Sequence, residues 1–285
     1  AQLQLMETVT GLVELRDQLQ GWRRRGEAIG FVPTMGNLHE GHLQLVRHAR
    51  SLADRVVVSI FVNPMQFGPG EDFETYPRTL DADRAQLERE RADLLFAPAV
   101  DLIYPSGLSE TTRVEVPGVG EGLEADFRPG FFVGVATVVA RLFNLVQADL
   151  AVFGEKDYQQ LAVIRRMVKD LCWPIDIEAV ATVREADGLA MSSRNQYLSA
   201  EQRGRAPALY QALCEVAEGV RRQRRAYAEL EAMAIRKLEQ AGFQPDYVCI
   251  REAVTLQPLA EGSLDAVVLA AAHLGRARLI DNVSV

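Results

Sequence analysis

Residues 29–42 read IGFVPTMGNLHEGH, and this stretch decides how the first part of the chain folds. Its first four residues are apolar or small, with β-branched residues among them, which predicts a buried strand over Ile29–Val32. Pro33 lacks a backbone N–H and is expected to stop the strand from pairing further. Gly36 and Gly41 then allow the backbone to approach a ligand closely before a helix begins. A strand that leads through a glycine loop into a helix is one unit of an α/β fold.

His39 and His42 lie three residues apart at the start of that helix, so their side chains share one face. Backbone N–H groups at a helix start attract phosphate oxygens through hydrogen bonds and the helix dipole. Imidazole N–H donors beside them can stabilise the charge that builds up in phosphoryl chemistry. Two other interpretations stay open here: a capped helix with two surface histidines, or a zinc site that needs a third ligand.

Short apolar runs alternate with helical patterns through the first two thirds of the chain. Runs of this kind, separated by helices, are typical of a parallel sheet covered on both faces. The sequence therefore predicts a doubly wound α/β sheet, in which ligands bind beyond the carboxyl ends of the strands. The predicted strands are Ile29–Val32, Val56–Val62, Leu94–Ala97 and Leu150–Phe153, and the predicted helices are Leu12–Arg24, His42–Ala53, Leu80–Arg91, Thr137–Val146 and Tyr158–Leu171.

The last third of the chain has a different pattern. Residues 200–240 are mostly helical and charged, and three candidate strands follow them closely. This order predicts a smaller α+β domain that starts near Val183. We expect one domain over residues 1–182 and a second over residues 183–285. The three candidate strands are Tyr247–Arg251, Val267–Ala272 and Leu279–Val283.

Polar residues follow two further predicted strands, where ligands are expected. Residues 61–68 read FVNPMQFG, and Asn63 and Gln66 carry donors and acceptors that suit a hydroxy acid. An ordinary Asn-Pro turn is the alternative. Residues 153–160 read FGEKDYQQ, in which Lys156 opposes the dipole of the following helix and so indicates another role, such as binding phosphate. A plain surface loop is the alternative at that position.

Two more motifs carry a weaker signal. Residues 76–83 read YPRTLDAD, whose carboxylates can bind Mg²⁺ together with substrate phosphates or can simply begin a solvated helix. Residues 190–195 read AMSSRN, in which small hydroxyl residues followed by an arginine can close over a triphosphate. A turn or a helix cap has the same composition.

Charge and cysteine content exclude several classes of protein. The chain has 285 residues and a formal net charge of −8, so we expect neither nucleic acid nor an anionic membrane as a partner. Its longest apolar runs are far shorter than the ~20 residues that span a bilayer. The three cysteines stand far apart in no metal-like spacing, which favours reduced thiols in the cytoplasm. Residues 1–10 contain no basic stretch followed by an apolar one, so no signal peptide is expected.

Taken together, the motifs resemble those of one enzyme superfamily. His39-x-x-His42 resembles the HIGH motif of nucleotidyltransferases, which include the class I aminoacyl-tRNA synthetases, and Met191–Arg194 is similar to their KMSKS loop. More narrowly, five segments resemble the pantothenate synthetase family in amino-acid sequence, order and spacing. The resemblance runs from about Leu12 to Gln202 and continues more weakly to the end of the chain. The five segments read PTMGNLHEGH, FVNPMQF, YPRT, FGEKDYQQL and VREADGLAMSSRNQYL.

The resemblance implies an ATP-dependent ligase that joins pantoate to β-alanine through a pantoyl-adenylate, releasing pyrophosphate and AMP. It also implies Mg²⁺, a Rossmann-like N-terminal domain, a smaller C-terminal lid domain and a homodimer. Two other functions fit parts of the pattern. Another small-molecule adenylyltransferase would keep the histidine pair, and a non-catalytic ATP-binding regulator would keep the nucleotide site alone.

The resemblance also assigns roles to individual positions. Two positions depart from the family pattern. Ala82 stands where many members have a second acidic residue, which argues against metal binding by a pair of carboxylates, and Phe131 replaces a histidine expected near the pantoate and β-alanine end. The implied catalytic residues around the ATP phosphates are His39, His42, Lys156, Ser192 and Arg194. The remaining nucleotide pocket comprises Pro33, Thr34, Met35, Gly36, Gly154, Asp157, Val183, Met191 and Ser193; pantoate is assigned to Asn63, Gln66 and Gln160, and Mg²⁺ to Asp83 and Gln86.

Overall fold

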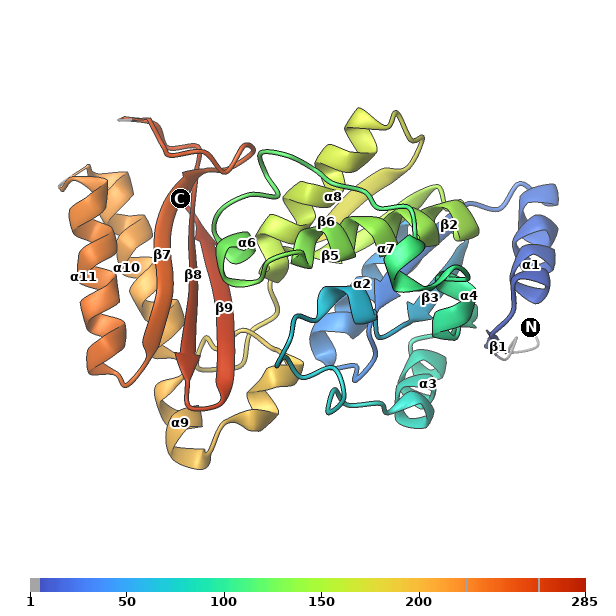
Figure 1. Ribbon diagram of the computed structural model, residues 1–285, viewed down its shortest axis with the longest axis horizontal. Coiled ribbons are helices and arrows are strands. Elements are labelled where there is room, and N and C mark those ends of the chain that lie inside the picture. Colours follow the sequence, from blue (N-terminus) through green and yellow to red (C-terminus); the bar gives the residue numbers. More distant parts are fainter. Residues whose placement is uncertain (1–5, 224, 261) are drawn as a thin grey trace. The chain divides into compact units, whose positions relative to one another are not determined.

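The computed structural model of the chain describes residues 6–223, 225–260 and 262–285, and Figure 1 labels its elements. Residues 1–5, on which part of the signal-peptide expectation rests, lie outside the described residues. The chain forms two compact units, and the expected functional division at residues 182 and 183 stays a prediction. The first unit comprises the chain up to Val116, Arg128–Glu155 and Val163–Ala181, and the second comprises Pro117–Phe127, Lys156–Ala162 and Thr182–Val285.

The first unit is built on a six-stranded parallel sheet, as predicted. Because β2 lies in the middle and successive strands are added outward from it on both sides, the sheet is doubly wound. The crevice at the carboxyl ends of β2 and β5, where the winding direction changes, is the expected ligand position in such a sheet. In sheet order the strands are β1 (Glu7–Val9), β4 (Leu94–Phe96), β3 (Arg55–Ile60), β2 (Ile29–Thr34), β5 (Leu150–Gly154) and β6 (Asp176–Val180).

Helices cover both faces of this sheet because neighbouring residues of each strand point to opposite sides. Val32 of β2 belongs to a buried cluster with Val46 and Ala49 of α2. Phe31, the residue before it, contacts Phe143 of α7 edge to face, with ring centroids 6.3 Å apart. Thus α2 and α7 lie on opposite faces, with α3 beside α2 and α1 beside α7. The helices are α1 (Leu12–Arg24), α2 (Glu40–Leu52), α3 (Leu80–Arg89), α4 (Val100–Ile103), α5 (Gly107–Glu110) and α7 (Phe131–Val146), with the short 3₁₀ turn η1 (Pro64–Gln66). Residues of η2 (Glu155–Asp157) and α8 (Tyr158–Asp170) are divided between the two units.

Two sequence expectations about this unit were wrong in detail, and two strands were missed. Pro33 does not stop the strand, since β2 stays in register with β3 through Thr34, whose carbonyl accepts from the N–H of Phe61 at 3.0 Å. Helix α7 begins at Phe131 rather than at the predicted Thr137, because Gly130 takes a left-handed conformation (φ 80°) just before it. Strands β1 and β6 were not predicted, because one has three residues and the other no continuous apolar run.

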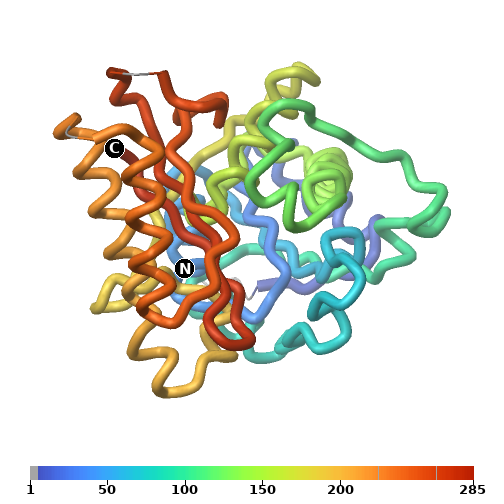
Figure 2. Tube along the Cα trace, turned by 60° about the vertical axis from the view of Figure 1, so that its left-hand side comes forward, coloured from blue at the N-terminus to red at the C-terminus, as the bar shows by residue number. Residues whose placement is uncertain are grey.

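The second unit contains an antiparallel sheet in the order β7-β8-β9, which confirms the three C-terminal strands predicted from sequence. Figures 1 and 2 show α10 and α11 side by side along one face of this sheet, where the apolar core of the unit lies. The other face packs against Leu123 and Leu256. The elements are α6 (Glu124–Phe127), η3 (Ser193–Tyr197), α9 (Ala200–Arg205), α10 (Ala208–Arg222), α11 (Tyr227–Gln240), β7 (Gln244–Glu252), β8 (Ala266–Leu274) and β9 (Ala277–Ser284).

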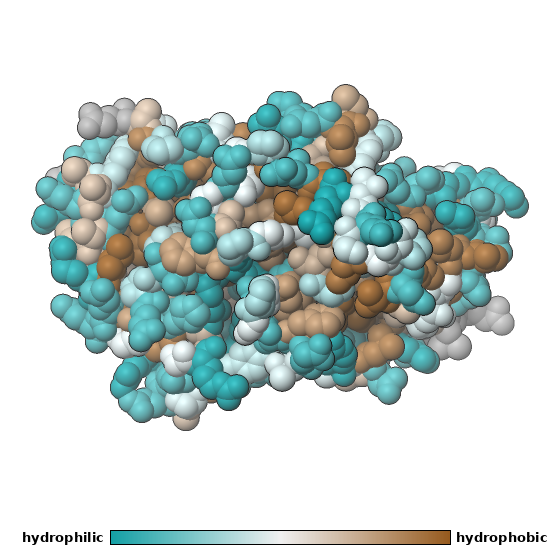
Figure 3. All heavy atoms as spheres, viewed as in Figure 1, coloured by the Kyte–Doolittle hydropathy of each residue, from teal (hydrophilic) through white to brown (hydrophobic). Residues whose placement is uncertain are grey.

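The surface mixes polar and apolar residues. On the face drawn in Figure 3, hydrophilic side chains are spread widely, with hydrophobic ones interspersed among them. Across residues 6–223, 225–260 and 262–285, none of the helices combines the length and the apolar character that crossing a bilayer requires.

Candidate functional site

The loop after β2 is held in a fixed shape by a buried aspartate from α3. Asp83 is 1% exposed, and its two carboxylate oxygens accept the backbone N–H groups of Asn37 at 2.9 Å and Leu38 at 2.8 Å. A Cβ at Gly36, whose φ is +80°, would lie 3.1 Å from the same carboxylate and 3.0 Å from Ile60, so only glycine fits without strain. The loop that precedes the histidine pair is therefore rigid.

The two histidines of this loop cap the start of α2. His39 is the N-cap residue, and its Nδ1 accepts the N–H of Gly41 at 3.1 Å. The N–H of His39 donates in turn to Nδ1 of His42 at 3.3 Å, and the two ring centroids are 4.2 Å apart. Since Nδ1 is the acceptor in both rings, the proton of each neutral imidazole lies on Nε2. The pair thus has the donor arrangement that an anion at a helix start requires.

The end of β2 completes this part of the predicted nucleotide pocket, with Pro33, Thr34 and Met35. Pro33 and Thr34 are the last residues of β2, and Thr34 Oγ1 donates to the carbonyl of Ser59 at 2.8 Å and accepts the N–H of Gly36 at 3.2 Å. Met35 is half-buried at the beginning of the loop. These contacts fix the backbone that leads into the capped helix.

The carboxylate predicted for Mg²⁺ also has a structural role. Asp83 already accepts two loop N–H groups, and Thr79 Oγ1 donates to it at 3.1 Å. Gln86 makes a long contact from its Nε2 to the carbonyl of Leu38, at 3.4 Å. In the part of the chain that the structure describes, no group of three or more His, Cys, Asp or Glu side chains is arranged to hold a metal. Asp83 thus shapes the loop, and the assignment of Asp83 and Gln86 to Mg²⁺ stays a prediction.

A second group of polar residues follows β3, the neighbour of β2 in the sheet. Asn63 is 1% exposed, and its Nδ2 donates to Gln66 Oε1 at 2.9 Å and to the carbonyl of Gly134 at 3.1 Å. Its Oδ1 accepts from Tyr104 Oη at 2.7 Å and from the N–H of Met65 at 3.2 Å. Burial raises the pKa of Tyr104 above its usual value, so the hydroxyl stays protonated and donates. Asn63 therefore orients the side chain of Gln66.

The backbone around Gln66 is held from two further sides. A Cβ on Gly134 of α7 would lie 2.3 Å from the carbonyl oxygen of Met65, so this close approach requires glycine. Arg128 donates to the carbonyl of Gln66 at 3.1 Å and forms an ion pair with Glu71 at 2.7 Å. Phe131, which replaces the histidine expected from the family, lies under Arg128 with 3.8 Å between guanidinium carbon and ring centroid. Phe131 thus supports the arginine that holds Gln66.

In the second unit, the segment after β5 is fixed by three side chains. Asn282 of β9 donates to the carbonyl of Lys156 at 3.0 Å, and Tyr158 Oη donates to the carbonyl of Ala253 at 2.8 Å. Buried Gln159 donates to the carbonyls of Val119 and Gly122, both at 3.1 Å. Lys156 and Asp157 form a long ion pair of 4.0 Å, and Gln160 is half-buried one residue further along α8. Gly154 ends β5 itself, in the first unit.

The predicted triphosphate loop begins on a short two-stranded ribbon. Arg184 pairs with Ala190 as an antiparallel bridge, and the N–H of Met191 donates to the carbonyl of Val183 at 2.9 Å. Ser192 caps η3 by accepting the N–H of Arg194 at 3.2 Å, and Ser193 is the first residue of η3. These bonds place Val183 next to Met191, as two members of the predicted nucleotide pocket.

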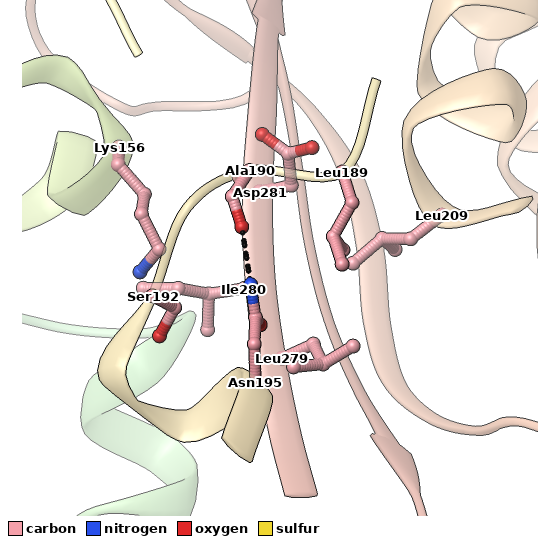
Figure 4. Close-up of a pocket in the computed structure, with 9 residues that line it drawn as sticks. All are labelled: Lys156, Leu189, Ala190, Ser192, Asn195, Leu209, Leu279, Ile280 and Asp281. Carbon is pink, nitrogen blue, oxygen red and sulfur yellow. Dashed lines mark hydrogen bonds between the residues drawn. The ribbon is translucent and has the colours of Figure 1, made fainter. Parts of the chain in front are cut away.

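Lys156 and Ser192 line one pocket of the second unit. Figure 4 shows the lysine side chain extending toward Ser192, while Asn195 donates to the carbonyl of Ala190 at 3.0 Å. Asp281 of β9 lines the same pocket. A cationic amine and a hydroxyl that share a pocket can together donate to phosphate oxygens. The structure therefore brings together two of the residues predicted to act on ATP.

Several residues of the site were missed from sequence. Tyr104, Gly134 and Arg128 hold Asn63 and Gln66, but they lie far away in the chain. Gln159 stands in the segment FGEKDYQQ, but no role was predicted for it. Asn282 lies outside all of the segments singled out from the sequence. Only Gly134, as a glycine inside an apolar helical run, carries a signal that could have been recognised, because such a glycine often marks close packing.

Comparisons with known proteins agree with this architecture. Pantothenate synthetase of Pseudomonas putida is 57% identical over 278 residues, which cover 98% of this chain and 97% of the relative. The crystal structure of pantothenate synthetase from Thermus thermophilus matches with a TM-score of 0.91 at 50% identity, covering 98% of this chain and 99% of that one.

A second solved structure is described with ligands. Pantoate-beta-alanine ligase from Francisella tularensis, described as complexed with beta-gamma ATP and beta-alanine, matches with a TM-score of 0.82 at 33% identity. This match covers 98% of the present chain and 97% of that one. In addition, the family model for pantoate-beta-alanine ligase matches residues 7–284. The chain therefore belongs to the pantoate-beta-alanine ligase family.

Proposed function

We propose that this chain joins pantoate to β-alanine at the expense of ATP, through a pantoyl-adenylate intermediate. The observation that carries the proposal is the placement of two sites on adjacent parallel strands. The imidazole pair follows β2, and the buried Asn63–Gln66 pair follows β3, so both lie at the same edge of one sheet. A phosphate site beside a hydroxy-acid site suits an enzyme that links a carboxylate to a nucleotide.

In the first step, a carboxylate oxygen of pantoate attacks the α-phosphorus of ATP, and the bond between that phosphorus and the bridging oxygen breaks. Pyrophosphate leaves with the bonding electrons. Both reactants are negatively charged, so positioning and charge neutralisation supply most of the catalysis. We assign donors to the phosphates from Nε2 of His39 and His42, from the charged groups of Lys156 and Arg194, and from the hydroxyl of Ser192. Mg²⁺ is assigned to ATP itself, as part of the substrate MgATP.

In the second step, the amine of β-alanine attacks the acyl carbon of the adenylate. The bond between that carbon and the phosphate oxygen breaks, AMP leaves, and the nitrogen loses a proton to give the amide.

Before the first step, Gln66 and Gln160 would orient the pantoate carboxylate, with Asn63 fixing Gln66. The remaining nucleotide contacts are assigned to Pro33, Thr34, Met35, Gly36, Gly154, Asp157, Val183, Met191 and Ser193.

Further parts of the proposal concern assembly and location. A homodimer fits the family resemblance. A location in the cytoplasm fits the three cysteines, which are all free thiols. Static light scattering that gave the mass of one chain per particle would remove the dimer. Residues 183–285 would act as a lid over the adenylate. Replacements in Met191–Asn195 that left adenylate hydrolysis as slow as in the wild type would argue against the lid.

The test of the proposed function is pyrophosphate release from MgATP, first with pantoate alone and then with β-alanine added. Release that needs pantoate, followed by AMP and pantothenate only when β-alanine is present, is the expected result. A folded protein that binds ATP but releases no pyrophosphate with pantoate would be a different adenylyltransferase or an ATP-binding regulator. Pyrophosphate release with another acid instead of pantoate would identify the protein as a different adenylyltransferase.

A further inference from the structure

Two segments that carry the donors assigned to ATP attach to neighbouring residues of β9. One segment contains Lys156, and the other is the ribbon that leads into Ser192–Arg194. The first attachment involves Asn282, and the second involves both Asp281 and Asn282, which are 4% and 7% exposed. All of these residues belong to the second unit. The contact pattern differs from ordinary strand pairing, because it runs through side chains.

The attachment of Lys156 depends on one side-chain amide. Asn282 Nδ2 donates to the carbonyl of Lys156 at 3.0 Å. The bond fixes the backbone from which the lysine side chain extends, without touching the amine. Because Asn282 pairs with Leu269 in the sheet register, its own position is set by the pairing of β9 with β8. A shift of Asn282 would therefore shift the origin of the lysine side chain.

The attachment of the ribbon depends on a largely buried arginine. Arg184 donates to both carboxylate oxygens of Asp281, at 2.7 and 2.9 Å, and to the carbonyl of Asn282 at 3.2 Å. It also donates to the carbonyl of Gly188 at 3.1 Å, and its guanidinium carbon lies 3.8 Å from the ring centroid of Tyr210. A planar guanidinium with two parallel bonds to a carboxylate has little orientational freedom. The ribbon is thereby fixed directly before Ser192.

The two attachments are linked to one another. The N–H of Asn282 donates to Oδ1 of Asp281 at 2.8 Å, so one carboxylate oxygen binds both Arg184 and Asn282. The pocket in Figure 4 shows the consequence, since Lys156, Ser192 and Asp281 line the same space. A network of buried, mutually bonded polar groups is rigid and favours one arrangement of the segments it joins.

A role in stability alone would be the simpler explanation of this network. Buried ion pairs, however, are weak contributors to net stability, because desolvation offsets most of their attraction. Such pairs are better suited to fixing geometry than to adding free energy. The geometry fixed here is the spacing between the two segments that carry the phosphate donors.

We propose that Asn282 and the Arg184–Asp281 pair are positioning residues for adenylate formation, which hold Lys156 and the Ser192–Arg194 loop at the spacing that ATP phosphates need. This inference rests on the proposed function. It predicts a defect in the rate of the first chemical step, whereas a purely structural role predicts a smaller fraction of active protein. The two can be separated by transient kinetics.

The experiment mixes enzyme with MgATP and pantoate, without β-alanine, and records the burst of pyrophosphate. Asn282→Ala is expected to lower the burst rate roughly ten- to a hundredfold, the size of effect that misplaced groups produce, with an unchanged amplitude per chain. Its kcat/KM for β-alanine in the full reaction should stay at the wild-type value, because that ratio reports only the second step. Ser284→Ala is the matched control on the same strand, since it keeps the carbonyl that accepts from Arg221.

Arg184→Lys provides a second variant that keeps a positive charge beside Asp281 but loses the two parallel bonds. It should show the same slow burst of full amplitude. A variant burst with wild-type rate, or with reduced amplitude at wild-type rate, would overturn the positioning role. Absence of pantoate-dependent pyrophosphate release from the wild type would instead reject the proposed function, so the two failures are distinguishable.

Discussion

His39 and His42 form a reciprocal cap at the start of α2, in which each Nδ1 is an acceptor. Nδ1 of His39 accepts from Gly41 at 3.1 Å, and Nδ1 of His42 accepts from His39 itself at 3.3 Å. One pair of side chains therefore completes the helix and fixes the orientation of both rings. The structural and the chemical role of each imidazole can be separated, because other residues can cap a helix but cannot present Nε2.

His39→Asn should retain the cap and lose the imidazole. Asparagine is among the best N-cap residues, so the free energy of unfolding should change by less than about 0.5 kcal/mol. Loss of one donor to the reacting phosphates should lower kcat/KM for MgATP roughly 10²- to 10³-fold. Urea denaturation and steady-state kinetics measure the two effects. His39→Ala should show the same kinetic defect and an additional loss of about 1 kcal/mol in stability.

The control for that series is His48→Asn, also on α2, where His48 lies 3.6 Å from Glu178. It should leave kcat/KM unchanged. Near-wild-type activity of His39→Asn would remove His39 from the catalytic residues and leave it as a helix cap.

Lys156→Ala should reduce transition-state stabilisation by about 2–4 kcal/mol, comparable to loss of one main charge-stabilising donor. The stability should hardly change, because the ion pair of its amine with Asp157 is a long contact of 4.0 Å and partly exposed pairs contribute little. Single-turnover pyrophosphate release measures the chemical step. Lys169→Ala, at the exposed end of the helix that follows, should behave as the wild type. Normal adenylation by Lys156→Ala would contradict the assignment.

Asn63→Ala should impair both stability and pantoate binding. It leaves Tyr104 Oη, the carbonyl of Gly134 and the amide of Gln66 without their buried partner, which should cost about 2–3 kcal/mol in unfolding free energy. The KM for pantoate should rise because Gln66 loses its orientation. Tyr104→Phe removes a single bond and should cost only about 1 kcal/mol, with little change in that KM. Equal pantoate KM values for all three proteins would show that Asn63 serves stability alone.

Gly134→Ala should displace η1, because the added Cβ would lie 2.3 Å from the carbonyl oxygen of Met65. We expect a loss of about 1–3 kcal/mol from overpacking and a raised KM for pantoate, since Gln66 follows directly. Gly204→Ala in α9 is the matched control, because a Cβ there meets nothing within 4 Å. That control should increase stability by about 0.4–1 kcal/mol. A Gly134→Ala protein as stable as the wild type would show that η1 can move without cost.

Glu124→Ala should destabilise the second unit. Both carboxylate oxygens of Glu124 accept from Arg278, at 2.7 and 2.9 Å, and Tyr247 Oη donates to it at 2.9 Å. Arg278 keeps its second ion pair, to Asp246 at 2.8 Å, so the loss should stay below the about 3–5 kcal/mol that an uncompensated buried charge costs. Hydrogen exchange of the β7–β9 amides measures this loss locally. Glu121→Ala, an exposed neighbour that keeps its backbone carbonyl, should leave the exchange rates unchanged.

Much of the fold could be read from local patterns. Apolar runs such as those of β2 and β3 identify buried parallel strands, and the spacing of apolar residues in α2 identifies an amphipathic helix. Strands without such a pattern were missed, since β6 is only half-buried and its residues do not alternate clearly. Pro33 was misjudged because the effect of a missing N–H on strand pairing depends on the neighbouring strand, which local sequence does not contain.

The sequence by itself determined the chemistry available at the ends of the strands: two histidines at a helix start, amides after the next strand, and a lysine after a third. Residue type and spacing along one helix or loop are local properties, so they can be read from the chain. Tertiary structure alone decided which distant groups hold those residues, as in the bonds from Tyr104 to Asn63 and from Asn282 to Lys156. The physical reason is that such contacts join residues dozens of positions apart, and only the packing of strands and helices sets the distances between them.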